Sequence, residues 1–203
     1  MHLSSYKNMQ AFAGKYLSGF TDSRLEILDI GSQDINGSYK QIFQNSKWRY
    51  TGADITPGEN VDLVLKNMYD WGNIKSNRYD VIVSGQTFEH IEYFWFTIME
   101  ISRILKTGGL CCLIAPSGGD EHKYPVDCWR FYPDGFRSLA RYAGLEVCDA
   151  AMQRSKELYP DYDPMWQDTI LVCRKTRLRP AQRIKLHLKN RLSVFLAIRL
   201  NLH

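Results

Sequence analysis

The chain has 203 residues, of which 44% are hydrophobic and 24% are charged, and its formal net charge is +4 at pH 7. This length and composition are typical of one soluble globular domain with a large core, and they exclude a disordered, collagen-like or disulfide-dense chain. No run of about 18 apolar residues is present, so no segment is expected to span a membrane.

Residues 5–20 carry apolar side chains at helical spacing, which predicts an N-terminal helix packed beside a sheet. The apolar run 25–30 then predicts a buried parallel strand that breaks at Gly31. A helical pattern follows over about residues 38–45. Strand, glycine turn and helix start together make the mononucleotide-binding corner of an open α/β sheet.

Six more segments read as strands: 48–54, 61–65, 79–84, 110–115, 145–150 and 168–175. Helices are expected over 94–105, with the glycines of 106–109 as its C-cap, and over 133–143, with proline in its first turn. The alternation predicts a doubly wound, mostly parallel, seven-stranded Rossmann-like sheet. No helix separates the last two strands, so we expect them to pair antiparallel.

The charge is uneven along the chain, because no acidic residue follows Asp168. Nine basic residues lie beyond Cys173, and without them the chain is mildly acidic. Residues 180–202 also carry apolar groups at helical spacing. We favour a terminal helix docked on its own domain or on a second subunit; the alternative is an interfacial helix at an anionic membrane. The chain divides into a domain, 1–176, and a basic tail, 177–203.

The five cysteines form no C-x-x-C pair, and the N-terminus lacks the basic and apolar segments of a signal peptide. We therefore expect reduced thiols and a cytoplasmic protein, with peripheral membrane contact through the tail as an open alternative.

The acid near the end of the first strand, Asp29, sets the type of ligand. A carboxylate there would repel the pyrophosphate of a dinucleotide, which prefers glycines and a helix N-terminus. It suits a cofactor that has an ammonium group and hydroxyls.

Five motifs in order resemble those of class I S-adenosylmethionine-dependent methyltransferases. They are Leu28 to Ser32, Gly52 to Asp54, Tyr79 to Ser84, Glu89 to Ile91 and Arg103 to Gly109. The later loop, Tyr124 to Phe131, is similar to that of the small-molecule branch, of the methyltransferase type 11 kind. Family members usually have Gly-x-Gly after the first acid, whereas this chain has Gly31-Ser32-Gln33, so the contacts of this loop are expected to differ.

The resemblance implies S-adenosyl-L-methionine as the cofactor and assigns its contacts by position. Asp29 and Gly31 would lie at its amino-acid end, and Asp54 would bind the ribose hydroxyls. Asn67 and Met68 would contact adenine, and Ser84 and Gly85 would lie beside the sulfonium carbon. For Met68, an ordinary core methionine is an equal alternative.

The loop 116–132 is long and aromatic, and it follows the fifth strand, so we expect it to be a lid over the substrate. His122 is the preferred general base, and His90 is the second candidate. The expected substrate contacts are Tyr124, Asp127, Trp129 and Arg130. The alternatives are an aromatic core cluster and an ion pair of Arg130 with Asp127 or Asp134.

No metal site is expected, because Glu89 and His90 have no obvious third ligand nearby in the sequence. Ser84 to Thr87 replaces the Asn/Asp-Pro-Pro-aromatic turn of enzymes that methylate base amino groups, so no nucleic-acid partner is expected. The leading function is O-methylation of a small-molecule or saccharide hydroxyl, by a chain that could form a homo-oligomer. The alternatives are a nicotinamide-dependent (NAD) oxidoreductase and a non-catalytic binding module with the same fold.

Overall fold

The computed structural model describes residues 2–153, 163–177 and 179–199. Its strands are β1 (Leu25–Ile30), β2 (Trp48–Asp54), β3 (Leu63–Val64), β4 (Tyr79–Gly85), β5 (Leu105–Ala115), β6 (Glu146–Met152) and β7 (Thr169–Arg174). They form one sheet in the order β3-β2-β1-β4-β5-β7-β6. Only β7 runs antiparallel to its neighbours, so the predicted seven-stranded, mostly parallel sheet is confirmed.

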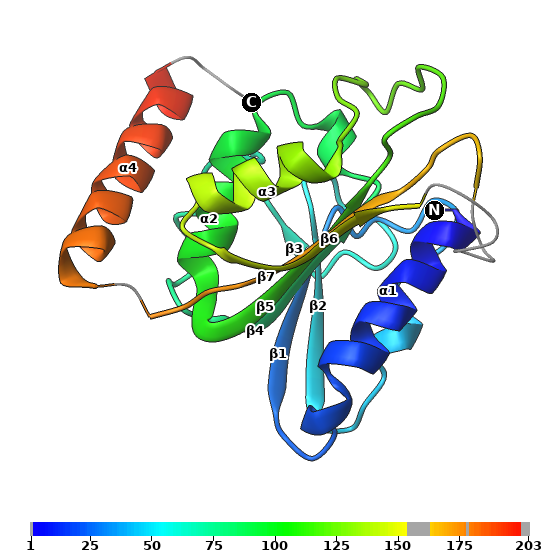
Figure 1. Cartoon of the computed structure of the whole chain (residues 1–203), viewed down its shortest axis with the longest axis horizontal. Coiled ribbons are helices and arrows are strands. Elements are labelled where there is room, and N and C mark those ends of the chain that lie inside the picture. Colours follow the sequence, from blue (N-terminus) through cyan, green and yellow to red (C-terminus); the bar gives the residue numbers. More distant parts are fainter. Residues whose placement is uncertain (1, 154–162, 178, 200–203) are drawn as a thin grey trace.

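The α-helices are α1 (Leu3–Tyr16), α2 (Phe94–Ile104), α3 (Pro133–Tyr142) and α4 (Pro180–Arg199). Short 3₁₀ helices are η1 (Ser18–Phe20), η2 (Lys40–Phe43) and η3 (Phe88–His90). Helix α1 covers one face of the sheet, α2 and α3 cover the other, and α4 lies outermost (Figure 1).

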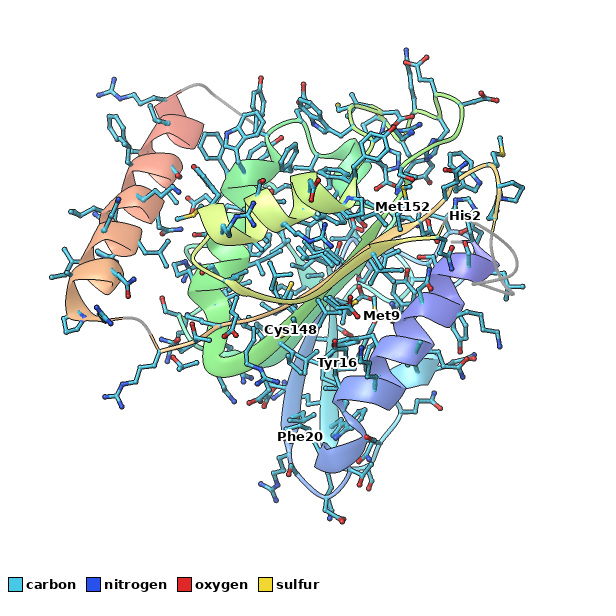
Figure 2. All side chains as sticks on the ribbon, viewed as in Figure 1. His2, Met9, Tyr16, Phe20, Cys148 and Met152 are labelled. Carbon is cyan, nitrogen blue, oxygen red and sulfur yellow. The ribbon has the colours of Figure 1, made fainter. Side chains whose placement is uncertain are left out.

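Both faces of the central strands are buried because their side chains alternate between two apolar layers. In β1, Ile27 packs with Met9 and Phe12 of α1, and Met9 lies between that helix and the sheet (Figure 2). The next residue, Leu28, belongs to the layer formed with α2 and α3. This explains why β1 reads as a continuous apolar run.

Strand order reverses between β1 and β4, since β2 and β3 lie on one side of β1 while β4 and β5 lie on the other. Ligands of open α/β sheets bind at such a switch point, outside the carboxyl ends of the strands. The ends of β1, β2 and β4 therefore mark the place where a site is expected.

Two local predictions were wrong. The helix expected over 38–45 is only the 3₁₀ turn η2, because the side chains of Ser38 and Asn45 accept backbone N–H groups that a helix would use. The glycines of 106–109 do not cap α2. The helix ends at Ile104 and the chain continues directly as β5, where the Gly108 N–H donates to the Lys175 carbonyl.

Helix α4 docks on the domain through polar groups. The Asn190 amide donates to Glu100 of α2 (3.1 Å), and the Lys189 ammonium donates to the Tyr142 carbonyl (2.7 Å). All five cysteines are free thiols, as predicted. None of the described helices is long and apolar enough to cross a bilayer.

Candidate active site

The loop after β1 is hydrogen-bonded to the end of β2. The backbone N–H groups of Gly31 and Ser32 both donate to the Ala53 carbonyl, and the Gln33 N–H donates to the Asp54 carboxylate (3.2 Å). Gly31 has a φ of 74°, and a Cβ added there would overlap the side chain of Thr87. Glycine is thus required by backbone conformation and by space.

Asn60, which the sequence analysis did not single out, holds this loop in shape. Its side-chain amide lies 3.0 Å from the Ser32 carbonyl, 2.9 Å from the Ser38 hydroxyl and 3.0 Å from the Tyr50 hydroxyl. The Ser32 hydroxyl donates back to the Asn60 carbonyl (3.0 Å). Ser32, at the variable position of Gly31-Ser32-Gln33, therefore holds the loop to Asn60 through its side chain.

Asp29 is buried, with 2% of its surface exposed, and it accepts a hydrogen bond from the Tyr50 hydroxyl (2.5 Å). Burial raises the pKa of Asp29 to about 7, although the Tyr50 hydrogen bond opposes the shift. A nearby ammonium would favour the carboxylate form. Asp29 is therefore placed so that binding of a positively charged ligand group would favour loss of its proton.

The ends of β1 and β4 are joined across the switch point. The buried Ser84 hydroxyl donates to the Ile30 carbonyl (2.9 Å), and the Tyr39 hydroxyl lies where a Cβ on Gly85 would be. Tyr39 in turn shares a hydrogen bond with Ser5 of α1 (2.5 Å). Tyr39 is a further residue at this edge that sequence patterns did not indicate.

Asn67 and Met68 lie beyond β3. The Asn67 side chain accepts the N–H groups of Tyr69 and Asp70 (2.8 and 2.9 Å), which fixes the turn. Met68 is 9% exposed and belongs to the core on the α2 side. Their contacts to adenine remain a prediction, and the packing of Met68 is that of a core methionine.

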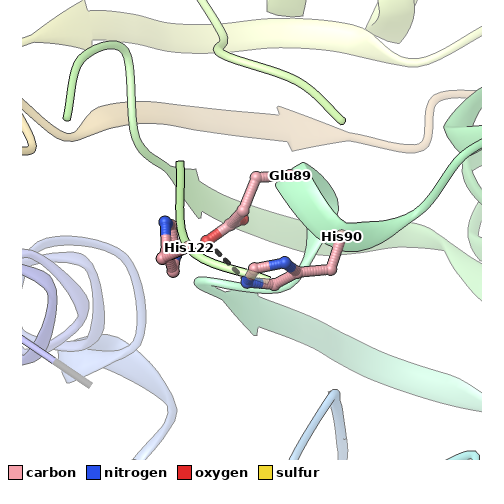
Figure 3. A group of neighbouring side chains, drawn as sticks. All are labelled: Glu89, His90 and His122. Atoms are coloured by element: carbon pink, nitrogen blue, oxygen red, sulfur yellow. Dashed lines mark ion pairs between the residues drawn. The ribbon is translucent and has the colours of Figure 1, made fainter. Parts of the chain in front are cut away.

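Glu89 and His90 lie in η3, just past β4, and the structure brings His122 to them from the loop after β5 (Figure 3). The Glu89 side chain is fully buried, and neither of its carboxylate oxygens has a hydrogen-bond donor among the described residues. Burial raises the pKa of Glu89 to about 8. This buried acid was not among the predicted site residues, because its burial depends on the later loop.

The two histidines are oriented by their second nitrogens. His90 Nδ1 lies 2.6 Å from the Val126 carbonyl, which can only accept, so the proton is on Nδ1 and Nε2 keeps its lone pair. That Nε2 atom is 3.7 Å from Glu89 Oε1. His122 Nδ1 lies 3.3 Å from the Asp120 carbonyl, to which it can donate, and 3.3 Å from Asp127 Oδ2, an arrangement that leaves its Nε2 free to accept a proton. Burial lowers the pKa of His90.

Asp127 and Arg130 form a two-bond ion pair (2.6 and 2.8 Å), and the Arg130 hydrogen bonds lower the pKa of Asp127 to about 2. The structure therefore shows the alternative expected for Arg130, an ion pair with Asp127 within the domain. An anchoring role of Arg130 toward substrate remains a prediction.

The aromatic residues of the loop divide into two groups. Tyr124 is 58% exposed, whereas the Trp129 ring packs on Phe94 and Trp95 and its indole N–H donates to the Ile91 carbonyl (3.1 Å). Tyr124 and Tyr132 (61% exposed) thus have rings that are open to solvent. The part of the loop around Trp129 belongs to an aromatic cluster with α2.

Trp166 and Asp168, which lie just before β7, complete this region. The Trp166 ring contacts His122 (4.5 Å between ring centres) and stacks on His2 (4.7 Å). The buried Asp168 accepts hydrogen bonds from Ser4 (2.8 Å) and Gln86 (2.9 Å). The last strand thereby connects α1, the end of β4 and the loop; no local pattern reveals such long-range contacts.

Two surface hollows of about 450 Å³ each lie around η2. One is bordered by Ser38 and Asn60 of the cofactor end. Neither is lined by Asp54 or His122. We therefore locate the site from the strand ends and the side-chain geometry.

Residues 28–113 match the family model of a methyltransferase domain. No curated protein matches the sequence. Among similar solved structures is the Burkholderia thailandensis 1,6-didemethyltoxoflavin-N1-methyltransferase, which holds 1,6-didemethyltoxoflavin and S-adenosylhomocysteine. It has 15% sequence identity and a TM-score of 0.64, and the match covers 85% of this chain and 79% of that one.

Two further structures show the same fold. The CurJ carbon methyltransferase has 15% identity and a TM-score of 0.63, with 85% of this chain and 54% of that chain covered. A SAM-dependent methyltransferase from Archaeoglobus fulgidus has 13% identity and a TM-score of 0.58, with 84% and 95% covered. At these identities the likeness is one of fold.

Proposed function

We propose that this chain, a class I S-adenosylmethionine-dependent methyltransferase, transfers a methyl group to a hydroxyl of a small molecule or saccharide. The observation that carries the proposal is the pairing of His122 with Asp127 at the carboxyl edge of the sheet. A neutral amine can attack with its free lone pair, whereas a hydroxyl must lose a proton as it reacts. An oriented imidazole base therefore favours a hydroxyl acceptor.

The residues at the strand ends fit the cofactor, because acids end β1 and β2 and Gly31 leaves the backbone open. We assign Asp29 and Gly31 to its amino-acid end, Asp54 to its ribose, Asn67 and Met68 to its adenine, and Ser84 and Gly85 to the sulfonium side. When bound, S-adenosylmethionine supplies a methyl group that leaves sulfur as the bond to the acceptor oxygen forms. The chain contributes alignment and a dry surrounding to this displacement.

His122 would take the hydroxyl proton on Nε2 during the transfer. Its Nδ1–H would donate to the Asp120 carbonyl (3.3 Å), and the nearby Asp127 carboxylate, 3.3 Å from the same nitrogen, would stabilise the imidazolium that results. Arg130 holds Asp127 ionised and in place. His90 is less suited to this task, because its Nε2 is directed at the buried Glu89.

The solved structures support a small acceptor in general terms. The toxoflavin enzyme holds a small heterocycle and, by its name, methylates nitrogen, while CurJ methylates carbon. The proposal that the acceptor is a hydroxyl therefore depends on His122 and not on these similar structures. The comparisons give no support for a nicotinamide-dependent oxidoreductase.

The test uses purified protein with S-adenosylmethionine and metabolite pools, and mass spectrometry identifies a product heavier by one CH₂. His122→Ala should bind the cofactor normally and lose about 10²- to 10⁴-fold in turnover, the usual loss for a general base. His90→Ala should be milder. His187→Ala, an exposed histidine of α4, is the control. Full turnover of His122→Ala together with loss in His90→Ala would assign the base to η3.

We also propose that α4 holds the enzyme at an anionic membrane surface. The helix buries Asn190 and Ser193 against the domain and packs Leu186 on its core, but turns five large apolar residues to solvent. The exposed stripe consists of Ile184 (61% exposed), Leu188 (63%), Leu192 (57%), Phe195 (52%) and Leu196 (40%). At 3.6 residues per turn, Lys185 and Arg191 flank this stripe, and no acid lies on the helix. Apolar residues bordered by cations match an anionic lipid surface.

The membrane proposal is tested by co-sedimentation with vesicles. The protein should bind phosphatidylserine-containing vesicles, bind weakly to pure phosphatidylcholine, and dissociate as salt is raised. Leu188→Ser should lose binding, whereas Val64→Ser, an exposed apolar residue of β3, should not. Concentration-dependent dimerisation that Leu188→Ser abolishes, without vesicle binding, would instead make a second copy of the chain the occupant.

A further inference from the structure

We infer that Glu89, His90 and His122 form a binding site for a first-row divalent cation of the zinc or ferrous type. One ligand atom of each side chain lies within 4.8 Å of the others, and the site in Figure 3 has the carboxylate between the two imidazoles. The distance from Glu89 Oε1 to His90 Nε2, 3.7 Å, is close to that of two ligands sharing one ion. The sequence offered no third ligand, and the fold supplies His122.

Each histidine already has the outer partner that metal-bound histidines have. His90 gives its Nδ1 proton to the Val126 carbonyl, and His122 Nδ1 lies 3.3 Å from both the Asp120 carbonyl and the Asp127 carboxylate. In metal sites such partners fix the ring and leave the other nitrogen as the ligand. Histidines that serve only to pack would not need this arrangement on both rings.

The buried carboxyl of Glu89 points to a missing partner. Its side chain is fully buried, yet neither oxygen meets a hydrogen-bond donor in the described residues. The guanidinium of Arg130, whose charge acts on Glu89, is paired with Asp127. A buried carboxylate without a partner is strongly unfavourable. A cation bound to Glu89 and the two imidazoles would supply the absent interaction.

Two imidazoles and one carboxylate define the class of ion. This set is typical of catalytic zinc and of non-haem ferrous iron, whereas calcium and magnesium prefer oxygen ligands. Three protein ligands leave at least one position open. Because His122 is partly exposed, that position would face the space under the loop 116–132.

The ion site stands on this geometry and does not depend on the acceptor being a hydroxyl. With an ion bound, His122 would be a ligand and no longer a free base. The ion would then act as the Lewis acid that makes an acceptor hydroxyl acidic, and the proton would leave to solvent. Binding of the ion can be measured without cofactor or acceptor, so its failure is separable from failure of the methyl-transfer proposal.

The test is titration of chelator-treated full-length protein with Zn²⁺ by calorimetry and with Co²⁺ by visible absorption. We expect one ion per chain and the absorption of Co²⁺ with nitrogen and oxygen ligands. Glu89→Gln and His122→Ala should each weaken binding more than about 100-fold, since loss of an outer partner alone costs about 10- to 100-fold. Asp127→Asn should show that smaller loss. The matched controls are Glu92→Gln, an exposed residue just after η3, and His187→Ala on α4. Both should bind the ion as the parent protein does.

Circular dichroism of each variant shows that it is folded, and His122→Ala, which changes a partly exposed loop residue, guards against a folding defect at the buried Glu89. Absence of stoichiometric binding in the parent protein would overturn the inference. So would binding that Glu89→Gln and His122→Ala leave unchanged.

Discussion

Asp29 carries an unusual ionisation state at the residue scale. Its pKa is raised from 3.8 to about 7 by burial in the folded protein. The folded state therefore holds a proton that the unfolded chain releases above its lower pKa, so stability falls as the pH rises from about 4 to about 7.

Asp29→Asn removes this pH dependence, because the amide stays neutral and can still accept the Tyr50 hydrogen bond. The variant should match the parent near pH 4 and exceed its free energy of unfolding by on the order of 4 kcal/mol above pH 7. Urea unfolding at a series of pH values measures this. Parallel stability curves for the two proteins would show that Asp29 is not desolvated.

Asp54 is the residue on which cofactor affinity is expected to depend most directly. Its carboxylate orients the loop after β1 through the Gln33 N–H and is only partly buried, so it remains accessible to ribose hydroxyls. Asp54→Ala should weaken S-adenosylmethionine binding by roughly 1–3 kcal/mol, the scale for losing a charged acceptor. Calorimetry decides: an unchanged dissociation constant in a folded variant would remove Asp54 from the site.

At the scale of elements, the loop 116–132 and η3 act as one unit. The N–H groups of Cys128 and Trp129 donate to the Glu89 carbonyl, and His90 contacts Val126. The expected lid is therefore held to η3 along one side, while its tip around Tyr124 is exposed to solvent.

Trp129→Ala tests this fastening. Loss of its packing on Phe94 and Trp95 should lower the free energy of unfolding by roughly 1–3 kcal/mol, less than for a fully buried tryptophan, because the side chain is 38% exposed. Amides of residues 117–131 should exchange with solvent faster, while those of β1 and β4 should not. Uniform acceleration over the whole sheet would mean that the loop and the sheet open together.

Elements with a strong local pattern were predictable, and those shaped by side-chain hydrogen bonds were not. The strands at 25–30 and 48–54 have their predicted limits because an apolar run ends at a glycine or an acid. The helix predicted at η2 was wrong because the side chains of Ser38 and Asn45 accept backbone N–H groups there. The helix cap predicted at the glycines of β5 was wrong because the Gly108 N–H donates to the Lys175 carbonyl.

At the scale of the whole molecule, the sheet and the edge where its parallel strands end followed from motif order, but the set of side chains that gather around Glu89 did not. Glu89 and His122 are distant in sequence and meet only after β5 has paired with β4. The outward apolar face of α4 was likewise beyond the pattern, which shows an amphipathic helix but not which side docks. Long-range packing decides both.

The place of β7 in the sheet has a consequence for biosynthesis. This strand is the last to be made, yet it lies between β5 and β6 and pairs with both. A nascent chain that has reached only Met152 has a complete cofactor half but an open edge on β5 and no partner for β6. A chain truncated after residue 152 should therefore aggregate or expose apolar surface to a fluorescent dye, whereas one ending at Thr176 should be compact. The sheet is thus complete only once β7 has been made, and a chain that has reached only Met152 is the form most in need of a chaperone.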